Sequence, residues 1–241
     1  MSHTVHPYAH RLGIIRDWKS RGFSTNSKYR EGLKVDILLR EWLEKKLRGM
    51  YIGDIEMERS QKAVRVIIKT SRPGMIIGRS GEGATKLKND IAKFIKDLNT
   101  KSAKQITIKY KKDADLMKIK LAELNMEIKV EIDEIKSPES SAPIIAQMIA
   151  EGLEKRMPFR RVMKTMADKV MASRDVLGVR LYLSGRLGGA EMARREDLKK
   201  GRIPLQTFRA DIDFKRYEAI LPYGNIGIKV WVYKGDIFAK K

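Results

Sequence analysis

Three basic side chains stand close together in the sequence: Arg160, Arg161 and Lys164. Pro158 precedes them, and because proline is tolerated in the first turn of a helix but not in its interior, a helix is predicted to begin just behind it. Residues three and four apart are neighbours on a helix surface, so these cations would project together. No acidic residue stands among them. Such a group is typical either of a solvated helix surface or of a contact with a phosphate backbone.

A second candidate site is the stretch Gly78-Arg79-Ser80-Gly81. Glycines at both ends of a two-residue loop let the backbone approach a sugar-phosphate strand closely, and a following helix would present its positive N-terminus to a phosphate. Arg79 adds a formal positive charge. A Gly-x-x-Gly alone usually marks only a turn, but this one follows two predicted strands and the apolar pair Ile76-Ile77, which favours a nucleic-acid contact.

A third group of cations surrounds a glycine-rich turn between Gly185 and Gly189. Arg186 lies within the turn, and Arg194 and Arg195 follow it. The glycines are typical of a hairpin that requires positive φ angles. Such a turn also lets Arg186 and its backbone meet a phosphate, so both interpretations stay open.

The elements that position these residues are predicted from hydrophobic periodicity. An apolar face at helical spacing backs the first basic group and is predicted to be core: Phe159, Val162, Met163, Met166, Val170 and Met171. Upstream, helical spacing covers 29–48, and strand alternation covers 53–58 and 63–70. A short helical turn, the glycine loop and another amphipathic helix follow.

The end of this first half is less regular. Residues 106–110 are predicted as a possible strand and 115–124 as a possible helix, so the segment around 99–126 is interpreted as an insertion. Alternation over 126–135 predicts the last strand of the domain. Ser137 to Pro143 then carries helix N-cap and first-turn signals, which place a domain boundary there.

The second half is predicted to contain two helices followed by strands at 179–183, 205–214 and 226–233. The expected fold class is therefore α+β, with two helices packed on a mostly antiparallel sheet in the second domain. The predicted boundaries are a tail over 1–18, a first domain over 19–136 and a second over 137–241.

Composition restricts the function. The 241 residues carry 51 Lys and Arg against 30 Asp and Glu, a net charge of +21. This excess predicts a polyanionic partner, and nucleic acid rather than a membrane, because no run approaches the roughly 18 consecutive apolar residues of a membrane-spanning helix. The absence of cysteine excludes disulfides, thiolate metal sites and a cysteine nucleophile.

Two arrangements were weighed for other chemistry. His3, His6 and His10 have a spacing that resembles a metal cluster, but no carboxylate or thiol is near to complete one, so a polar tail is expected. Asp211 and Asp213 would face the same side of a strand. Such a pair is more often structural or solvated than the metal site of a nuclease.

The order helix, strand, strand, short helix, Gly-x-x-Gly and helix resembles a KH domain of type II, which implies a clamp over about four nucleotides of single-stranded backbone. Over nearly its whole length the chain is similar to the bacterial-type family of small-subunit ribosomal protein S-three. Six motifs at compatible spacing carry this resemblance: Arg11–Trp18, Pro73–Gly81, Phe159–Lys164, Ser184–Glu191, Arg209–Asp213 and Gly227–Trp231.

The resemblance implies a structural constituent of the small subunit, neither an enzyme nor a cofactor-binding protein. It implies ribosomal RNA in the head and mRNA at the entrance channel as partners, with ribosomal proteins S-ten and S-fourteen as neighbours and S-four and S-five around the channel. Arg160, Arg161 and Lys164 match the family's residues for unwinding structured mRNA. Ribosomal RNA contacts are expected at Arg11, Arg186, Arg194 and Arg195.

The implied location is the cytoplasmic ribosome, with an organellar ribosome as the alternative and no membrane association. A transcription factor or an assembly GTPase with a KH module is a rival hypothesis. It would require a second KH copy, an S-one-type barrel or a phosphate-binding loop, and the sequence contains no such pattern.

Overall fold

The computed structural model describes residues 5–60, 63–109 and 127–238 of the chain. The chain divides into two compact units, Lys19–Glu134 and a second one that joins residues up to Trp18 to residues from Ile135 onward. We call them the KH-like unit and the C-terminal unit. Among the described residues, no helix is long and apolar enough to cross a membrane.

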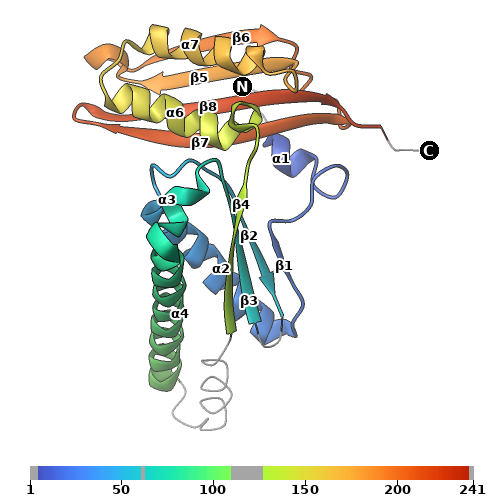
Figure 1. Ribbon diagram of the computed structural model, residues 1–241, viewed down its shortest axis with the longest axis vertical. Helices are drawn as coiled ribbons and strands as arrows, with labels where there is room; N and C mark the ends of the chain where they lie inside the picture. Colours follow the sequence, from blue (N-terminus) through green and yellow to red (C-terminus); the bar gives the residue numbers. More distant parts are fainter. Residues whose placement is uncertain (1–4, 61–62, 110–126, 239–241) are drawn as a thin grey trace. The chain divides into compact units, whose positions relative to one another are not determined.

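The KH-like unit is a mixed sheet with helices packed on one face (Figure 1). The strands lie in the order β1-β2-β3-β4, in which β2 and β3 are antiparallel and the two outer pairs are parallel. In chain order the elements are β1 (Ser20–Gly22), α2 (Asn26–Lys46), β2 (Ile52–Arg59), β3 (Ala63–Thr70), α3 (Pro73–Ile77), η1 (Arg79–Gly81), α4 (Glu82–Lys109) and β4 (Glu127–Glu134).

Apolar periodicity produces the core of this unit. Leu39 and Leu43 recur four residues apart on α2 and are fully buried, and Val64 and Val66 point to the same face of β3. Ile91 of α4 closes the core from the other helix. Burying each such side chain is worth about 1.5–3 kcal/mol, so this packing holds α3, η1 and the start of α4 in place.

The expectation of a strand over 106–110 is wrong, because α4 continues to Lys109. Ile106 and Ile108 favour a strand by local propensity, but extending an existing helix adds a hydrogen bond per residue without a new nucleation cost. The proposed helix over 115–124 and most of the proposed insertion fall on residues 110–126, which lie outside the described residues. The short strand β1 was not predicted, since three residues carry no alternation signal.

The C-terminal unit is an antiparallel sheet with α6 and α7 on one face. Its strands lie in the order β6-β5-β8-β7, and all three pairings are antiparallel. From Pro138 onward the elements are η2 (Pro138–Ser140), α6 (Ala142–Glu154), α7 (Phe159–Ala172), β5 (Gly178–Gly185), η3 (Leu187–Gly189), β6 (Arg194–Gly201), β7 (Ala210–Leu221) and β8 (Gly224–Asp236). The α+β class and the arrangement of this domain are confirmed.

Two strands of this sheet differ from the sequence-based expectation. β6 was not predicted, because Leu198 is the only large apolar residue in a strand of charged side chains at the sheet edge. The strand expected over 205–214 begins only at Ala210 and continues to Leu221. Neither difference changes the core, in which alternate residues of β5 and β8, such as Leu181 and Val230, pack against the helices.

Residues 5–18 belong to the C-terminal unit and are not a free tail. α1 (Pro7–His10) packs on β7, and Arg11 is completely buried. Nη2 of Arg16 lies 2.5 Å from Oδ1 of Asp211. The chain start therefore covers one end of the sheet face that α6 and α7 leave open.

Candidate nucleic-acid interface

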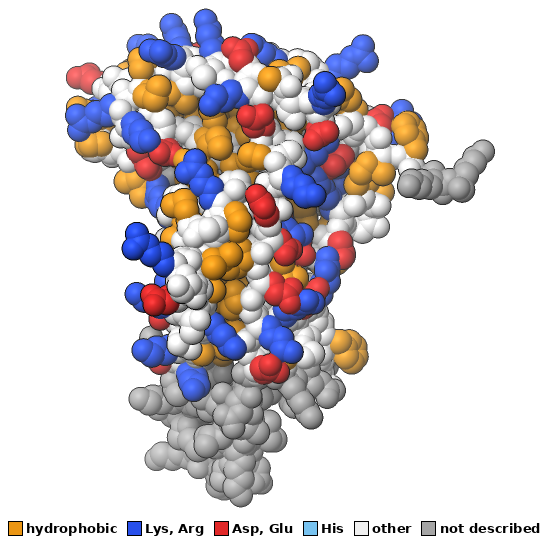
Figure 2. Space-filling view, viewed as in Figure 1, with side chains coloured by type: hydrophobic (Ala, Val, Ile, Leu, Met, Phe, Trp, Pro, Cys, Tyr) orange, Lys and Arg blue, Asp and Glu red, His pale blue; other side chains and the backbone are white. Residues whose placement is uncertain are grey.

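The helix α7 presents its predicted basic group above a buried apolar face. Val162, Met163 and Met166 are buried against the sheet. Arg160, Arg161 and Lys164 are exposed on the other side. Figure 2 shows Lys and Arg side chains gathered over the region of α7 and β6. The buried face fixes the helix, so the cations project from a rigid support.

The three cations of α7 are not equivalent. Nη2 of Arg160 lies 3.1 Å from Oε1 of Glu196 on β6, an acid that sequence proximity could not reveal. Arg161 and Lys164 have no carboxylate partner among the described residues. Because the Arg160 side chain is 73% exposed, its ion pair is worth less than about 1 kcal/mol. A phosphate can therefore compete for Arg160 at little cost.

The glycine-rich turn lies beside the beginning of α7. Gly188 has a φ of 69°, and a Cβ placed on it would be 4.0 Å from the ring of Phe159. Nε of Arg186 donates to the main-chain oxygen of Ala190 at 2.9 Å, which anchors the guanidinium while the side chain stays exposed. The structure thus brings Arg186 and the start of the basic helix into one neighbourhood of the C-terminal unit.

Arg194 and Arg195, which follow the glycine-rich turn in the sequence, begin β6. Strand alternation sends them to opposite faces of the sheet. Arg194 shares the α7 side with Glu196, while Arg195 lies opposite Ser184 on the face without helices. Only Arg194 can therefore act together with the α7 cations.

Arg11 does not belong to an exposed basic surface. It is 0% exposed, and its guanidinium donates to the main-chain oxygens of Ala210 at 2.6 Å, Thr207 at 2.8 Å and Leu205 at 3.0 Å. Burial lowers the pKa of Arg11, and the nearby carboxylate of Asp211 opposes that shift. The expectation of an RNA contact at Arg11 is corrected: this side chain joins the first residues of the chain to the end of β7.

The Gly-x-x-Gly loop joins α3 to α4 and exposes Arg79 and Ser80. The backbone enters the left-handed region at Gly78, Ser80 and Gly81, with φ of 70°, 54° and 80°. Glycine takes this conformation without strain. Arg79 has no carboxylate partner among the described residues. The loop therefore offers a bare backbone and one unpaired guanidinium.

A further glycine, which the sequence analysis did not single out, brings the two helices together. A Cβ on Gly83 would lie 2.5 Å from the carbonyl oxygen of Ile76 and 2.8 Å from that of Ile77. No other residue fits there without moving α3 or α4. In the sequence, the only indication of this close contact was a further glycine two positions after Gly81.

Beside the loop, the first turns of α4 border a surface depression of about 550 Å³. Its lining carries both signs of charge: Ser80, Glu82, Thr85, Lys86, Asn89, Asp90 and Lys93. A hydrogen bond from Lys46 lowers the pKa of Asp90 and keeps it charged. Because acids and bases alternate here, the loop rather than this depression is the better candidate for a phosphate contact.

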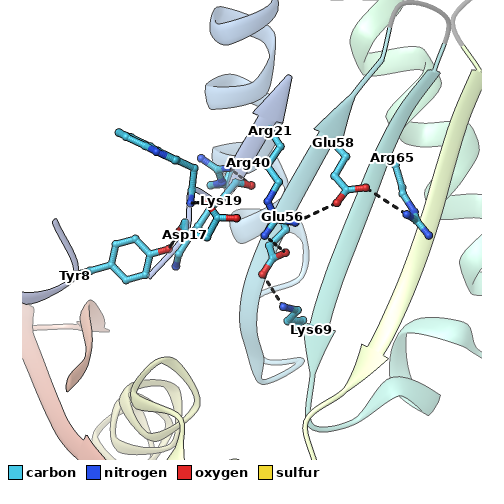
Figure 3. A network of polar contacts seen from close by, with 10 residues as sticks. Tyr8, Asp17, Lys19, Arg21, Arg40, Glu56, Glu58, Arg65 and Lys69 are labelled. Atoms are coloured by element: carbon cyan, nitrogen blue, oxygen red, sulfur yellow. Dashed lines mark hydrogen bonds and ion pairs between the residues drawn. The ribbon is translucent and has the colours of Figure 1, made fainter. Parts of the chain in front are cut away.

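The face of the KH-like sheet without helices has a different character, and we call it the paired face (Figure 3). Each cation on the described part of this face has a carboxylate partner. Oε1 of Glu56 lies 2.5 Å from Nζ of Lys69, and Glu58 lies 3.1 Å from Arg21 and 3.2 Å from Arg65. The remaining pairs are Arg65–Glu131, Lys129–Glu127 and Lys19–Asp54.

The residues weighed for catalysis have structural partners. Asp211 and Asp213 lie on the same side of β7, as predicted, because the register shift between Asp211 and Ile212 skips a residue of β8 and leaves the alternation of β7 intact. Asp211 binds Arg16, and Asp213 accepts a hydrogen bond from the main-chain nitrogen of Ala142 at 2.9 Å.

The histidines also pack within the C-terminal unit, where His6 lies edge-on to Phe214 and His10 stacks on Phe208. His3 lies outside the described residues. Within the part of the chain that is described, no group of three potential metal ligands occurs.

Comparison with known proteins identifies two domain families in this chain. The KH domain family matches residues 38–140, and the family described as ribosomal protein S3, C-terminal domain, matches residues 149–232. The small ribosomal subunit protein uS3 of Caldicellulosiruptor bescii is 41% identical over 241 residues, which cover 100% of this chain and 96% of the relative.

Two other relatives give the same result. The uS3 protein of Clostridium novyi is 39% identical over 241 residues, covering 100% of this chain and 96% of the relative. That of Hydrogenovibrio crunogenus is 38% identical over 240 residues, covering 100% and 92%. With two domain families matched in the expected order and relatives similar over the full length, the chain belongs to the small ribosomal subunit protein uS3 family.

Proposed function

We propose that this chain is a constituent of the small ribosomal subunit that binds ribosomal RNA in the head and mRNA at the entrance channel, where it helps to unwind structured mRNA. Family membership supports the ribosomal role, and the KH domain match supports RNA binding. Proteins of this family are structural and not enzymatic. The proposed location is accordingly the ribosome of the cytoplasm.

The observation that carries the mRNA proposal is the unpaired charge on α7. Arg161 and Lys164 lie exposed on a helix whose opposite face is core, and the exposed ion pair of Arg160 with Glu196 is weak. Cations on a rigid support need little ordering when they meet a phosphate backbone.

The proposed mechanism needs no catalytic centre. Separated strands have lost their base pairing, and fixed cations at a constriction stabilise their phosphates. Translocation by the ribosome supplies the work that pulls the duplex apart. The α7 cations then bias the separated state and hold it until the next step.

The test is translation by small subunits that carry Arg160→Ala, Arg161→Ala and Lys164→Ala together. These positions are exposed, so folding and incorporation into the subunit should be retained. We expect severalfold slower translation through a stable mRNA hairpin and unchanged rates on an unstructured message. Equal slowing on both messages would contradict the unwinding role.

A matched control removes three exposed cations from other parts of the chain, with Lys34→Ala, Lys45→Ala and Lys136→Ala. If net charge alone matters, this variant slows on the hairpin as much as the α7 variant does. The proposal expects it to translate both messages at the wild-type rate.

We further propose that the loop from Gly78 to Gly81 contacts an RNA backbone. The exposed Arg79 and the left-handed backbone support it. Changing Arg79→Asp and Ser80→Asp places two negative charges in the loop, and aspartate tolerates the positive φ of position 80. Binding of single-stranded RNA should then fall by at least tenfold, which filter binding or fluorescence anisotropy would measure.

The control for the loop is Arg79→Gln with Ser80→Asn, which removes the positive charge without adding negative ones. Asparagine also accepts the left-handed conformation. We expect a loss of only a fewfold. If both loop variants bind as tightly as the wild type, the loop does not contact RNA.

Arg186, Arg194 and Arg195 are proposed contacts with ribosomal RNA, in line with their exposure. The proposed protein neighbours are S-ten and S-fourteen, with S-four and S-five around the mRNA channel. Cross-linking of assembled small subunits with mass spectrometry would test them. Absence of links from this chain to all of these proteins would contradict the placement.

A further inference from the structure

The sheet of the C-terminal unit has a face without helices, and its open part carries cations on all four strands. Cross-strand pairing aligns Tyr182 of β5, Lys229 of β8 and Arg216 of β7 in one row. The next row along the strands contains Arg180 opposite Trp231. We call this surface the open face: Arg180, Tyr182, Ser184, Arg195, Asp197, Lys199, Arg216, Glu218, Gly227, Lys229 and Trp231.

Aromatic rings support the central cations. Cζ of Arg180 lies 4.9 Å from the ring centre of Trp231, and Nζ of Lys229 lies 5.4 Å from that of Tyr182. Arg216 lies 5.7 Å from the ring centre of Phe214 on its own strand. A cation over an aromatic ring is held in place without losing its charge, whereas a carboxylate partner would neutralise it.

The charge balance leaves this surface positive. Asp197 forms a two-point pair with Arg180, with contacts of 3.0 Å and 2.8 Å, and lies 3.7 Å from Lys199. Glu218 accepts a hydrogen bond from Asn225. No carboxylate pairs with Arg195, Arg216 or Lys229 among the described residues.

The surface is also low in relief next to these cations. Ser184 and Gly227 occupy the row beside Tyr182 and Lys229, and a Cβ on Gly227 would come within 3.0 Å of the Ser184 hydroxyl. A sheet face with cations, a partly exposed tyrosine and small residues fits a nucleic-acid strand, because phosphates can contact the cations and bases can stack on an aromatic ring. An acidic protein segment would use the cations but not the bare sheet.

We propose that the open face is a second RNA-binding surface of the C-terminal unit and that it takes the backbone of a ribosomal RNA segment. Lys229 and Arg216 make the central phosphate contacts, and Arg195 and Lys199 extend them along β6. This inference rests on the proposed function, because it assumes that the chain is embedded in ribosomal RNA.

The open face and the α7 cations lie on opposite sides of the same sheet. Arg195 points to the open face, and Arg194 points to the α7 side. One RNA strand cannot contact both through so thin a layer, so the two surfaces would serve different RNA segments. Loss of the open face should therefore weaken binding to ribosomal RNA while leaving hairpin unwinding intact.

The test measures binding of the full chain to a transcript of the head region of small-subunit ribosomal RNA over a range of salt concentrations. The variant is Lys229→Gln with Arg216→Gln. Each lost phosphate contact should lower the salt slope by about one. We expect a slope reduced by about two and an affinity reduced on the order of tenfold. Lys169→Gln with Arg174→Gln is the matched control, because it removes the same charge from exposed positions of the same unit.

The possible outcomes are distinct. An equal loss in the control pair would mean that only net charge matters and would overturn the inference. A wild-type chain that binds without salt dependence would contradict the proposed function itself. If the wild type binds RNA with the expected salt dependence and the Lys229→Gln, Arg216→Gln variant binds equally well, the open face does not contact RNA. The proposed function would then still stand.

Two further measurements distinguish a specific surface from general attraction. Tyr182→Leu removes the ring beneath Lys229 but no charge, and should weaken binding about two- to fivefold, while Tyr182→Phe should retain it. Cross-linking of assembled small subunits should join peptides around Tyr182 or Lys229 to RNA. Links from these peptides to another protein alone would overturn the proposal in favour of a protein partner.

Discussion

Each of the two sheets of the chain has one face without helices. The cations of one face pair with carboxylates, whereas the central cations of the other lie over aromatic rings. On the paired face of the KH-like unit, Arg21, Arg65 and Lys69 all contact carboxylates of Glu56 or Glu58. On the open face of the C-terminal unit, Lys229 and Arg216 lie over aromatic rings instead. Both faces are rich in basic residues, so the number of cations does not distinguish them.

We infer from this difference that pairing decides which part of a basic protein can attract RNA. A cation with a carboxylate partner contributes little field at a distance, because the two charges cancel. A cation over a ring keeps its full charge. In a chain of +21, we therefore expect RNA contacts where solvent-accessible cations lack a carboxylate partner among the described residues. The proposed contacts of this kind are Arg161 and Lys164 on α7, Arg79 in the Gly-x-x-Gly loop, and Arg216 and Lys229 on the open face.

The largest expected effect concerns the residue that closes one end of the open face. Arg11→Met leaves the carbonyl oxygens of Ala210, Thr207 and Leu205 without the guanidinium that they accept from. We expect the free energy of unfolding of the C-terminal unit to fall by about 3–5 kcal/mol, because a buried charged hydrogen-bond network is broken. Urea denaturation followed by circular dichroism would measure it.

Arg16→Met is the comparison for Arg11. Its ion pair with Asp211 is partly exposed, with side-chain exposures of 26% and 18%, so the loss should be about 1 kcal/mol. If Arg11→Met lowers the free energy of unfolding no more than Arg16→Met does, the buried guanidinium does not fix residues 5–18 against the sheet. The end of the open face would then not be closed by a stable contact.

An intermediate effect, on RNA affinity, is expected when carboxylates are removed from the paired face so that its cations resemble those of the open face. Glu56→Gln with Glu58→Gln removes the carboxylates that contact Arg21 and Lys69, while Arg65 keeps its pair with Glu131. RNA affinity should rise on the order of tenfold and the salt slope by about two, because new cations become available to phosphates. Each lost exposed pair should change stability by less than about 1 kcal/mol.

The control adds the same charge elsewhere, with Glu41→Gln and Glu139→Gln, both of which are exposed. A smaller rise than in the paired-face variant supports the importance of local pairing. An equal rise in both variants would show that net charge governs binding, and the distinction between the two faces would lose its meaning.

The smallest expected effect concerns the melting temperature of the KH-like unit. It tests whether an ion pair of this unit stabilises the fold or only neutralises charge. Lys46 on α2 lowers the pKa of Asp90 on α4 below its ordinary value of 3.8. A lowered folded-state pKa contributes stability above the unfolded-state value, and that contribution is lost as pH falls through the folded-state pKa. Wild type should therefore melt slightly above Asp90→Asn at neutral pH, with the gap closing below about pH 4.

Thermal melting of the two proteins between neutral and acidic pH provides the measurement. Asp90→Asn keeps the size and shape of the side chain, so a gap that stays constant with pH would show that the pair contributes no charge interaction. The pair would then only mask charge, as the pairs of the paired face are expected to do.

Much of this protein is determined by the local pattern of its sequence. Pro158 and the apolar spacing behind it predicted α7, because a helix start and a buried helix face are both encoded within a few turns. Alternation predicted β3, β4 and β5, and Gly78 with Gly81 marked the loop between two helices. These features depend on backbone preferences and on contacts between near neighbours in the chain.

Only the tertiary structure decided which charges are free. Arg11 looked like a candidate for RNA contact until Ala210, 199 positions away, was found to accept its hydrogen bond. Arg160 acquired a partner in Glu196 from an edge strand with almost no apolar signal. Arg194 and Arg195, adjacent in sequence, went to opposite faces. Ion pairs form between residues that are far apart in the sequence and close only in the fold, so local periodicity cannot predict them.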